Sequence, residues 1–314
     1  MRVVFMGTPD FSVPSLQALL DNDYEVVGVF TQPDRPKGRG GKVQMSPVKE
    51  LALQYSLPVI QPLKIRQDGL EPLRALSPDV CVTAAFGQIL SQEVLDVPKI
   101  GTVNVHASLL PRHRGSAPVQ WAILQGEQVT GVTTMLTDKG IDTGDMLLRE
   151  QVPIDPEDTA GTLLEKLSRV GAELLVKTLQ GLEAGTVTPI PQNPEEATYD
   201  PMLKKEMGLL DLSKPVEECI CRIRAMSPWP CAWVPLAGEN VLKVWRGAPA
   251  SGWETAEPGT ILCADPKKGL VVAAGNGAME LCEIQAPGAK RMAARAFLLG
   301  HSLPLGKKLN EVEL

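Results

Sequence analysis

The sequence predicts an α/β protein with a mostly parallel sheet, followed by a smaller antiparallel β domain. In the first part of the chain, short β-rich runs alternate with helical patterns, as they do in βαβ units. One of these runs, Val26–Phe30, is almost entirely apolar, which is typical of a strand covered on both faces. Later in the chain, short β-like runs follow one another between Gly, Pro and Asp residues, which is the pattern of a small antiparallel barrel.

The elements of the first part follow in chain order. The β-rich runs predict strands at Arg2–Met6, Glu25–Phe30, Asp79–Ala84 and Thr102–His106, with later ones near Gly131–Leu136 and Met146–Val152. Apolar residues at helical spacing predict helices at Val13–Leu20, Pro47–Tyr55, Pro118–Gln125 and Thr159–Leu182. The last is the clearest, because Asp158 or Thr159 can cap its start and Gly185 lies near its end.

Residues 188–204 separate two domains in this prediction. The stretch is rich in proline, polar and without periodicity, which is typical of a semi-rigid linker. It follows a domain of residues 1–187 and precedes one of residues 205–314. In the second domain we expect a short helix at Val216–Met226 and strands at Ala232–Leu236, Val241–Trp245, Gly259–Cys263, Gly269–Ala273 and Ala278–Ile284.

The turn after the first strand, Gly7-Thr8-Pro9-Asp10, stands where a nucleotide-binding fold holds a phosphate. It lacks the GxGxxG pattern, so a dinucleotide site is not supported. We expect a tight strand-to-helix turn in a Rossmann-like sheet.

Composition and charge argue against several classes of protein. The net charge of −6 argues against a nonspecific nucleic-acid coat, so any polyanion must meet local basic patches. The six cysteines form no CxxC pair and no ligand pattern with histidine, so we expect no metal and reduced thiols in a cytoplasmic protein. No apolar run approaches the ~20 residues that span a membrane, and the chain opens on a strand rather than a signal peptide. We therefore expect no membrane partner.

The most informative residues lie at the end of the strand expected at Thr102–His106. Asn104 and His106 point to one face of this strand, and a loop bounded by Pro and Gly follows. An imidazole can act as acid, base or hydrogen-bond donor near neutral pH, and an amide can donate to an oxyanion without changing its charge. Asp142, in a Gly-flanked loop, could orient or charge the imidazole. Each residue also has an ordinary interpretation, as a structural strand end or a turn former.

Two further motifs, Ser108-Leu109-Leu110-Pro111 and Arg114-Gly115, change that balance. With them the chain resembles the folate-dependent formyltransferases, in which an Asn/His/Asp set and an SLLP-type loop form the formyl-transfer site. The resemblance implies a metal-free site with catalytic residues Asn104, His106 and Asp142, and with Ser108, Leu109, Leu110 and Pro111 binding the co-substrate 10-formyltetrahydrofolate. The chain departs from the family at His113, where an aromatic residue often sits.

A Pro/Gly-rich loop, Thr31–Lys42, follows the second expected strand and leaves the sheet on the same edge as the Asn104/His106 site. Taken alone, it is an ordinary solvated loop. Its QPDRP and GRG patterns, however, resemble the loop that methionyl-tRNA formyltransferases insert at the acceptor arm of tRNA. The resemblance implies RNA contacts by Arg39 first, and also by Arg35, Lys37 and Lys42.

The resemblance to methionyl-tRNA formyltransferases covers nearly the whole chain. It implies a Rossmann-like formyltransferase catalytic domain at residues 1–187, a linker at 188–204 and an OB-like, tRNA-binding β-barrel domain at 205–314. It further implies a monomer that transfers the formyl group of 10-formyltetrahydrofolate to the α-amino group of methionyl initiator tRNA for translation initiation. In that reaction Asn104 and protonated His106 would donate to the oxyanion, while Asp142 holds the imidazole and favours its charged form.

Three alternatives stay open. A formyltransferase acting on a nucleotide or nucleotide-sugar amine would keep the Asn/His/Asp set but would not need the Arg35–Lys42 loop. A formyltetrahydrofolate hydrolase would use water as the acceptor and usually carries a different accessory domain. A non-catalytic tRNA- or folate-binding protein would tolerate the loss of His106 or Asp142, and both are present.

Overall fold

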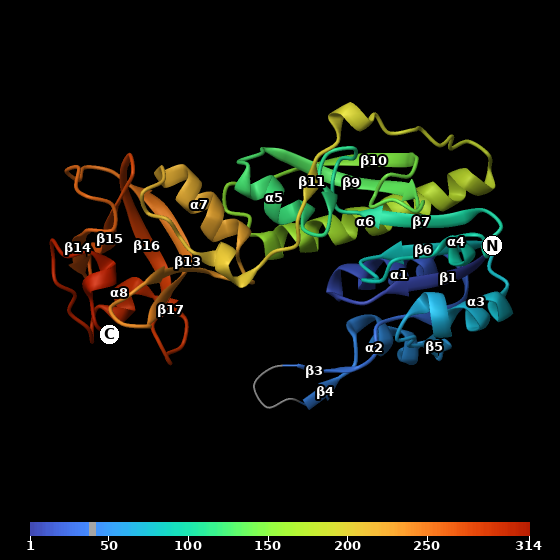
Figure 1. The fold of residues 1–314 in the computed structure, drawn as a ribbon, viewed down its shortest axis with the longest axis horizontal. Coiled ribbons are helices and arrows are strands. Elements are labelled where there is room, and N and C mark those ends of the chain that lie inside the picture. Colours follow the sequence, from blue (N-terminus) through green and yellow to red (C-terminus); the bar gives the residue numbers. More distant parts are fainter. Residues whose placement is uncertain (38–41) are drawn as a thin grey trace. The chain divides into compact units, whose positions relative to one another are not determined.

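The computed structural model describes residues 1–37 and 42–314, and the chain divides into two compact units. The first unit comprises Met1–Pro118, Val129–Pro153 and Leu164–Asp200. The second comprises Val119–Gln128, Ile154–Leu163 and Pro201–Leu314. Figure 1 labels most of the helices and strands of both, coloured along the chain from blue to red.

A seven-stranded sheet forms the centre of the first unit. In spatial order its strands are β10 (Met146–Pro153), β9 (Val129–Leu136), β7 (Gly101–His106), β6 (Val80–Ala84), β1 (Arg2–Gly7), β2 (Glu25–Phe30) and β5 (Val59–Ile60). The strands from β7 to β5 run parallel to one another, while β9 is antiparallel to both β7 and β10. This topology confirms the α/β fold and the mostly parallel sheet.

The helices of the first unit lie between these strands along the chain, except for the last, which follows β10. They are α1 (Val13–Asp21), α2 (Pro47–Gln54), α3 (Leu70–Leu76), α4 (Gln92–Leu95) and the long α6 (Ala160–Glu183), whose first turn belongs to the second unit, with a π-helical turn at Ile65–Gly69 and 3-10 turns at Asp10–Ser12 and Pro194–Glu196. The start of α2 follows from its sequence, because Ser46 accepts from the backbone N–H of Lys49 and Pro47 occupies the first turn. The expected ends of α1, α2 and α6 agree with the structure to within a residue.

Two short strand pairs complete the first unit. Strands β3 (Arg35–Lys37) and β4 (Lys42–Gln44) form an antiparallel hairpin. Strands β8 (Arg114–Gly115) and β11 (Tyr199–Asp200) pair in parallel. The second pair brings together parts of the chain that are far apart in sequence.

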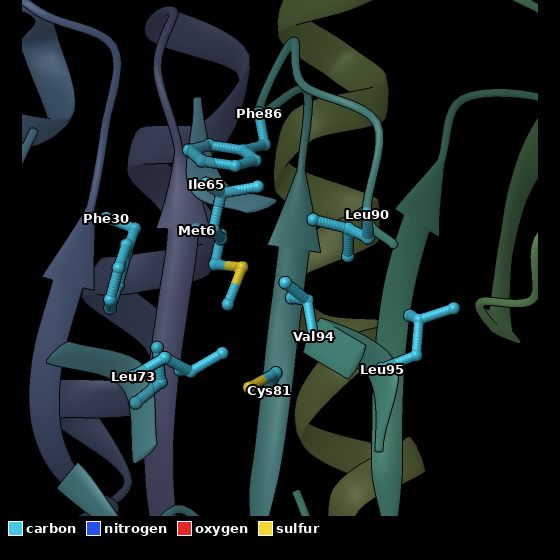
Figure 2. Packing of buried hydrophobic residues seen from close by; sticks show 10 residues of the cluster. Met6, Phe30, Ile65, Leu73, Cys81, Phe86, Leu90, Val94 and Leu95 are labelled. Carbon is cyan, nitrogen blue, oxygen red and sulfur yellow. The ribbon is translucent and has the colours of Figure 1, made fainter. Parts of the chain in front are cut away.

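One face of the large sheet carries a compact apolar cluster (Figure 2). Met6, Phe30 and Cys81 extend from β1, β2 and β6 toward the same side and pack there with Ile65 and Leu73. All five side chains are fully buried. Shortening one of the large aliphatic ones to alanine costs about 2–5 kcal/mol, since the gap is only partly refilled. The cluster therefore fixes β6, the neighbour of β7, whose carboxyl end carries most of the polar residues described below.

On the opposite face, helix α6 lies close to β7. Gly171 faces Val105, and a Cβ on this glycine would lie 2.8 Å from Val105 Cγ1. The absence of a side chain is what permits the close approach. Because side chains alternate along a strand, Asn104 and His106 point away from α6.

An antiparallel sheet forms most of the second unit. In spatial order its strands are β12 (Ala232–Pro235), β13 (Val241–Ala250), β16 (Gly277–Gln285), β15 (Gly269–Ala274) and β14 (Ile261–Asp265), with β17 (Met292–Ala293) paired to β16. The unit also contains α7 (Val216–Ala225), α8 (Ala294–Phe297), all but the first residue of α5 (Pro118–Leu124), and 3-10 turns at Lys205–Gly208 and Leu309–Glu311. The antiparallel C-terminal sheet expected from the sequence is confirmed.

The segment Gly306–Val312 joins the two outer strands of this second sheet. The carbonyl of Lys307 accepts from the N–H of Ile261 in β14, at 2.9 Å. The carbonyl of Val312 accepts from the N–H of Ala237, just beyond β12, at 3.0 Å. Backbone groups that an open edge would expose are therefore paired, as in the expected barrel.

Candidate active site

Asn104 lies near the carboxyl end of β7, on the face of the sheet away from α6. Its Oδ1 accepts a hydrogen bond of 2.9 Å from the hydroxyl of Thr83, in the neighbouring strand β6. This contact orients the amide, because only its oxygen can accept. The amide nitrogen Nδ2 is thereby left as the group that can donate to a ligand.

His106 ends β7, and only 6% of the residue is exposed. Its Nε2 lies 2.9 Å from the backbone carbonyl oxygen of His113. A carbonyl can only accept, so Nε2 carries a proton and donates it here. Nδ1 lies 3.7 Å from Oδ2 of Asp142, too far for a direct hydrogen bond. Nδ1 is therefore the ring nitrogen that can exchange a proton with a ligand.

Asp142 lies in the loop between β9 and β10, with a positive φ of 52°. Its Oδ2 accepts from the backbone N–H of Gly115 at 2.9 Å. Asp138 shapes the same loop, because its carboxylate accepts from the N–H of Gly140 and the hydroxyl of Thr143. The carboxylate of Asp142 thus faces the imidazole with one oxygen held by the backbone.

The backbone of His113–Gly115 supports both the imidazole and the carboxylate. His113 has a φ of 59° and Gly115 a φ of 111°, both in the positive region. A Cβ at Gly115 would lie 2.5 Å from the carbonyl oxygen of Asp200, so a side chain here would need the backbone to move. These conformations turn the carbonyl of His113 toward the imidazole of His106 and the N–H of Gly115 toward the carboxylate of Asp142. They explain why a glycine follows Arg114.

Gln192 connects this backbone to the loop of Asp142, although it lies in the expected linker. Its Oε1 accepts from Nε and Nη2 of Arg114, at 3.0 and 2.8 Å. Its Nε2 donates to the carbonyl oxygens of Asp142 and Gly144, at 2.8 and 2.7 Å. Both ends of one buried amide are therefore used to hold the site together.

A second contact joins Asp200 to the ring of His113. Its Oδ2 lies 2.7 Å from Nδ1, and both side chains are buried. Sequence reasoning missed Asp200, Gln192 and Thr83 as site residues. Of these three, only Thr83 could have been recognised from the sequence. It is a polar residue in the otherwise apolar run Val80–Ala84, where a buried hydroxyl needs a hydrogen-bond partner.

The loop Ser108–Pro111, expected to bind folate, is largely buried within the first unit. The carbonyl of Ser108 accepts from the hydroxyl of Thr133 at 2.7 Å, and that hydroxyl accepts from the N–H of Leu110 at 3.1 Å. The side chains of the loop are buried, apart from that of Leu109, which is partly exposed. A direct contact between this loop and folate stays a prediction.

The cations expected to meet tRNA fall partly on the β3–β4 hairpin. Arg35, which is exposed, and Lys37 belong to β3, and Lys42 begins β4. Arg39, for which the strongest RNA role was expected, lies outside the described residues.

A polar network anchors the base of this hairpin. Lys49 Nζ donates to Asp34 at 2.6 Å and to Gln61 at 2.8 Å, and the hydroxyls of Thr31 and Ser46 share a hydrogen bond of 2.7 Å. The pKa of Asp34 is lowered, mainly by the hydrogen bond from Lys49 and then by that from Gln61. Charged and polar contacts therefore hold the residues that flank β3 and β4.

Neither a metal centre nor a membrane helix is found in the described part of the chain. Residues 1–37 and 42–314 hold no group of three or more His, Cys, Asp or Glu side chains placed to bind a metal ion. Within the same residues, no helix has both the length and the apolar character needed to cross a bilayer.

Comparison with known proteins decides the family. Residues 1–179 match the family model of formyl transferases, and residues 202–302 match that of the formyl transferase C-terminal domain. The methionyl-tRNA formyltransferase of Trichlorobacter lovleyi is 51% identical over 309 residues, covering 98% of this chain and 96% of the relative. That of Bacillus subtilis is 49% identical over 310 residues, covering 98% and 97%. The chain belongs to the methionyl-tRNA formyltransferase family.

Two solved structures share the fold of this formyltransferase at low identity. HypX from Aquifex aeolicus, in complex with tetrahydrofolic acid, matches 96% of the chain with a TM-score of 0.64 at 18% identity, and the chain spans 47% of HypX. WlaRD, a sugar 3N-formyl transferase solved with dTDP and 5-N-formyl-THF, matches 92% of the chain and 99% of its own length with a TM-score of 0.66 at 19% identity. At these identities the likeness concerns the fold alone.

Proposed function

We propose that this protein transfers the formyl group of 10-formyltetrahydrofolate to the α-amino group of methionyl initiator tRNA. The product is N-formylmethionyl-tRNA, which serves translation initiation. The observation that carries the proposal is 51% identity to a methionyl-tRNA formyltransferase over 98% of the chain. The geometry around Asn104, His106 and Asp142 supports it, since formyl transfer needs donors to an oxyanion and a route for a proton.

Asn104 and His106 have the right atoms free to stabilise the oxyanion. When the acceptor amine attacks the formyl carbon, the carbonyl electron pair moves onto the formyl oxygen. We assign Nδ2 of Asn104 and protonated Nδ1 of His106 as its donors, because Oδ1 and Nε2 are already bonded within the protein. Each donor of this kind typically lowers the barrier by about 3 kcal/mol.

Asp142 is suited to the proton transfer that completes the reaction. The attacking amine must lose a proton, and the folate nitrogen must gain one as its bond to the formyl carbon breaks. We assign this transfer to Asp142, directly or through water. Its carboxylate, 3.7 Å from Nδ1, also balances the charge of the imidazolium of His106.

The proposal gives the two parts of the chain different tasks. Residues 1–187 form the catalytic domain and residues 205–314 the tRNA-binding domain, with 188–204 between them, although the residues up to Asp200 belong to the first unit. The separate family matches to residues 1–179 and 202–302 support this division. The donor meets Ser108–Pro111 through its backbone and Leu109, and the tRNA meets Arg35, Lys37, Arg39 and Lys42. We propose a monomer in the cytoplasm, which light scattering and cell fractionation can test.

A second candidate function is formylation of a sugar-nucleotide amine. The candidate comes from WlaRD, a sugar 3N-formyl transferase whose fold 92% of this chain shares at 19% identity. The β3–β4 hairpin and the high identity to the methionyl-tRNA enzymes favour tRNA instead.

One labelling experiment separates these candidates. The purified protein is incubated with 10-formyltetrahydrofolate labelled in the formyl group and with three acceptors: initiator methionyl-tRNA, elongator methionyl-tRNA and a dTDP-amino sugar. Label on initiator methionyl-tRNA is expected. Label on the sugar alone would replace the proposed acceptor, and labelled formate released without any acceptor would indicate a hydrolase. Binding of tRNA or folate with no transfer at all would indicate a non-catalytic protein.

A further inference from the structure

The short strand β11 holds the backbone that supports the imidazole and the carboxylate. It pairs with Arg114 and Gly115 in parallel register. The N–H of Arg114 donates to the carbonyl of Thr198 at 2.9 Å, and the N–H of Ser116 donates to that of Asp200 at 3.3 Å. The two contacts that fix the catalytic side chains therefore depend on residues far later in the chain.

Asp200 adds a side-chain contact to this backbone pairing. Its Oδ2 lies 2.7 Å from Nδ1 of His113, and only 3% and 4% of the two side chains are exposed. A buried carboxylate without a partner is costly, so each group constrains the other. His113 has a φ of 59°, a region that non-glycine residues rarely adopt, so the contacts of its backbone and of its ring are needed to hold it there. Fixing the ring therefore fixes the carbonyl that receives the proton of His106.

Gln192 makes a parallel connection to the loop that bears the carboxylate. It donates to the carbonyls of Asp142 and Gly144 and accepts from Arg114. The guanidinium of Arg114 also donates to the hydroxyl of Tyr199 at 2.8 Å and lies 5.5 Å from the centre of that ring. One amide thus ties the loop of the carboxylate to the segment that supplies its backbone donor.

We propose that Asp200 and Gln192 are positioning residues for formyl transfer. Without touching the reacting atoms, they set the separation between the imidazole of His106 and the carboxylate of Asp142. The inference rests on the proposed function, since it concerns the same site. A displacement of about 1 Å in such a site can reduce the rate about 100-fold. Loss of either residue therefore acts on turnover more than on substrate binding.

The first experiment removes the acceptor oxygen of Asp200 and then restores it. Asp200→Ala leaves the ring of His113 without this partner, whereas Asp200→Asn keeps an oxygen in its place. We expect kcat on methionyl-tRNA to fall about 10- to 100-fold in Asp200→Ala, with KM for both substrates within about two-fold. Asp200→Asn regains most of the lost kcat.

A matched control is Asp79→Ala, at the opposite end of the sheet. Asp79 accepts from the backbone N–H of Arg2 at 2.8 Å, so its loss affects stability but not the site. Equal kcat values for Asp200→Ala and Asp79→Ala, at a temperature where both are folded, would overturn the proposal. Gln192→Ala is the second variant, with the same expected fall in kcat, and it decides the matter if Asp200→Ala does not fold.

Nitrogen NMR of the imidazole rings tests positioning without any substrate. The chain has three histidines, His106, His113 and His301, so assignment needs few variants. In the wild type, at a pH where the rings are neutral, we expect the proton of His106 on Nε2 and that of His113 on Nδ1, as their acceptors require. In Asp200→Ala or Gln192→Ala we expect His106 to become a mixture of tautomers, with His301 unchanged.

The two experiments keep the inference and the proposed function apart. A wild-type protein without activity on methionyl-tRNA contradicts the proposed function, while the NMR signals still report on positioning. An active wild type whose variants leave the His106 signals unchanged contradicts the inference alone.

Discussion

The hydroxyl of Thr83 donates a hydrogen bond of 2.9 Å to Oδ1 of Asn104 across two neighbouring strands. The contact follows from the register of the parallel pair, in which Thr83 of β6 lies beside Asn104 of β7. It decides which end of the amide faces away from the protein. A side chain that could donate or accept is thereby committed to donate, which suits a ligand that develops negative charge.

Thr83→Val tests this orientation. The change keeps the shape of the side chain and removes the donor, so the amide of Asn104 can turn over. We expect kcat for formyl transfer to fall about ten-fold, or ~1.4 kcal/mol, with KM nearly unchanged. Thr134→Val is the control, because that hydroxyl contacts Thr178 on the other face of the sheet. Equal activity of the two variants would make Thr83 an ordinary structural residue.

His106→Ala should lower the single-turnover rate about 100- to 1,000-fold while leaving the circular dichroism spectrum unchanged, because it removes a donor to the oxyanion. Asn104→Ala should have an effect of the same order. Combining the two should cost less than the product of the single effects, since both act on one transition state. Strictly multiplicative losses would show that they act separately.

Arg39→Ala should weaken use of the tRNA and spare the folate donor. The expectation rests on the sequence of the glycine-rich loop, since Arg39 lies outside the described residues. If Arg39 only attracts phosphate, the defect shrinks steeply as salt rises and is similar for any tRNA. If Arg39 also positions the acceptor end of the tRNA, the substitution lowers kcat and raises KM. Arg39→Lys, compared on initiator and elongator methionyl-tRNA, distinguishes the two, and unchanged kinetics on both would contradict any role.

The thiol of Cys81 should be inert in the native protein. Burial raises its pKa from 9.0 to about 12, and only the thiolate reacts. The stabilising contribution of this group is fully present below pH 9 and is lost as the pH rises toward 12, since the unfolded thiol ionises first. Titration with a disulfide reagent at pH 8 should modify the partly exposed Cys221 and Cys282 first and Cys81 only on unfolding. Equally fast labelling of Cys81 would show that this strand opens in the native state.

Gly115→Ala and Gly185→Ala form a matched pair. Both glycines have a positive φ, of 111° and 65°. A Cβ at Gly185 meets nothing within 4 Å, whereas one at Gly115 would lie 2.5 Å from the carbonyl oxygen of Asp200. Gly185→Ala should therefore cost about 1–2 kcal/mol from its conformation alone, and Gly115→Ala should cost more and also lower kcat. Urea unfolding and turnover check both, and equal costs would rule out the close approach.

Much of the first unit could be predicted because its elements carry local signals. Ser46 and a following proline mark the start of α2, and regularly spaced leucines define α6. Helices α3 and α4 were not predicted, since each is too short to show periodicity and Pro72 lies within α3. The antiparallel direction of β9 was not predicted either, because strand alternation is the same in both directions.

Only some of the residues of the candidate site could be predicted from the sequence. Asn104 and His106 were predictable together because alternation along one strand places them on one face. Asp142 was predicted from its Gly-flanked loop and from the resemblance to the formyltransferases. Gln192 and Asp200 could not be predicted, since their roles depend on how residues 188–200 pack within the first unit, and that stretch has no periodicity to indicate burial.

The close approach of Gly171 to Val105 bears on how this fold can change over evolution. The backbone of α6 at Gly171 stands directly behind β7, on the face opposite to Asn104 and His106, with the side chain of Val105 between them. A side chain added at Gly171 would have to displace Val105 or move the helix, because its Cβ would lie 2.8 Å from Val105 Cγ1. New acceptor preferences must arise in the loops around the strand end, while the strand and its backing helix are inherited as one block. For engineering, the same block is the part to leave untouched when a loop is exchanged.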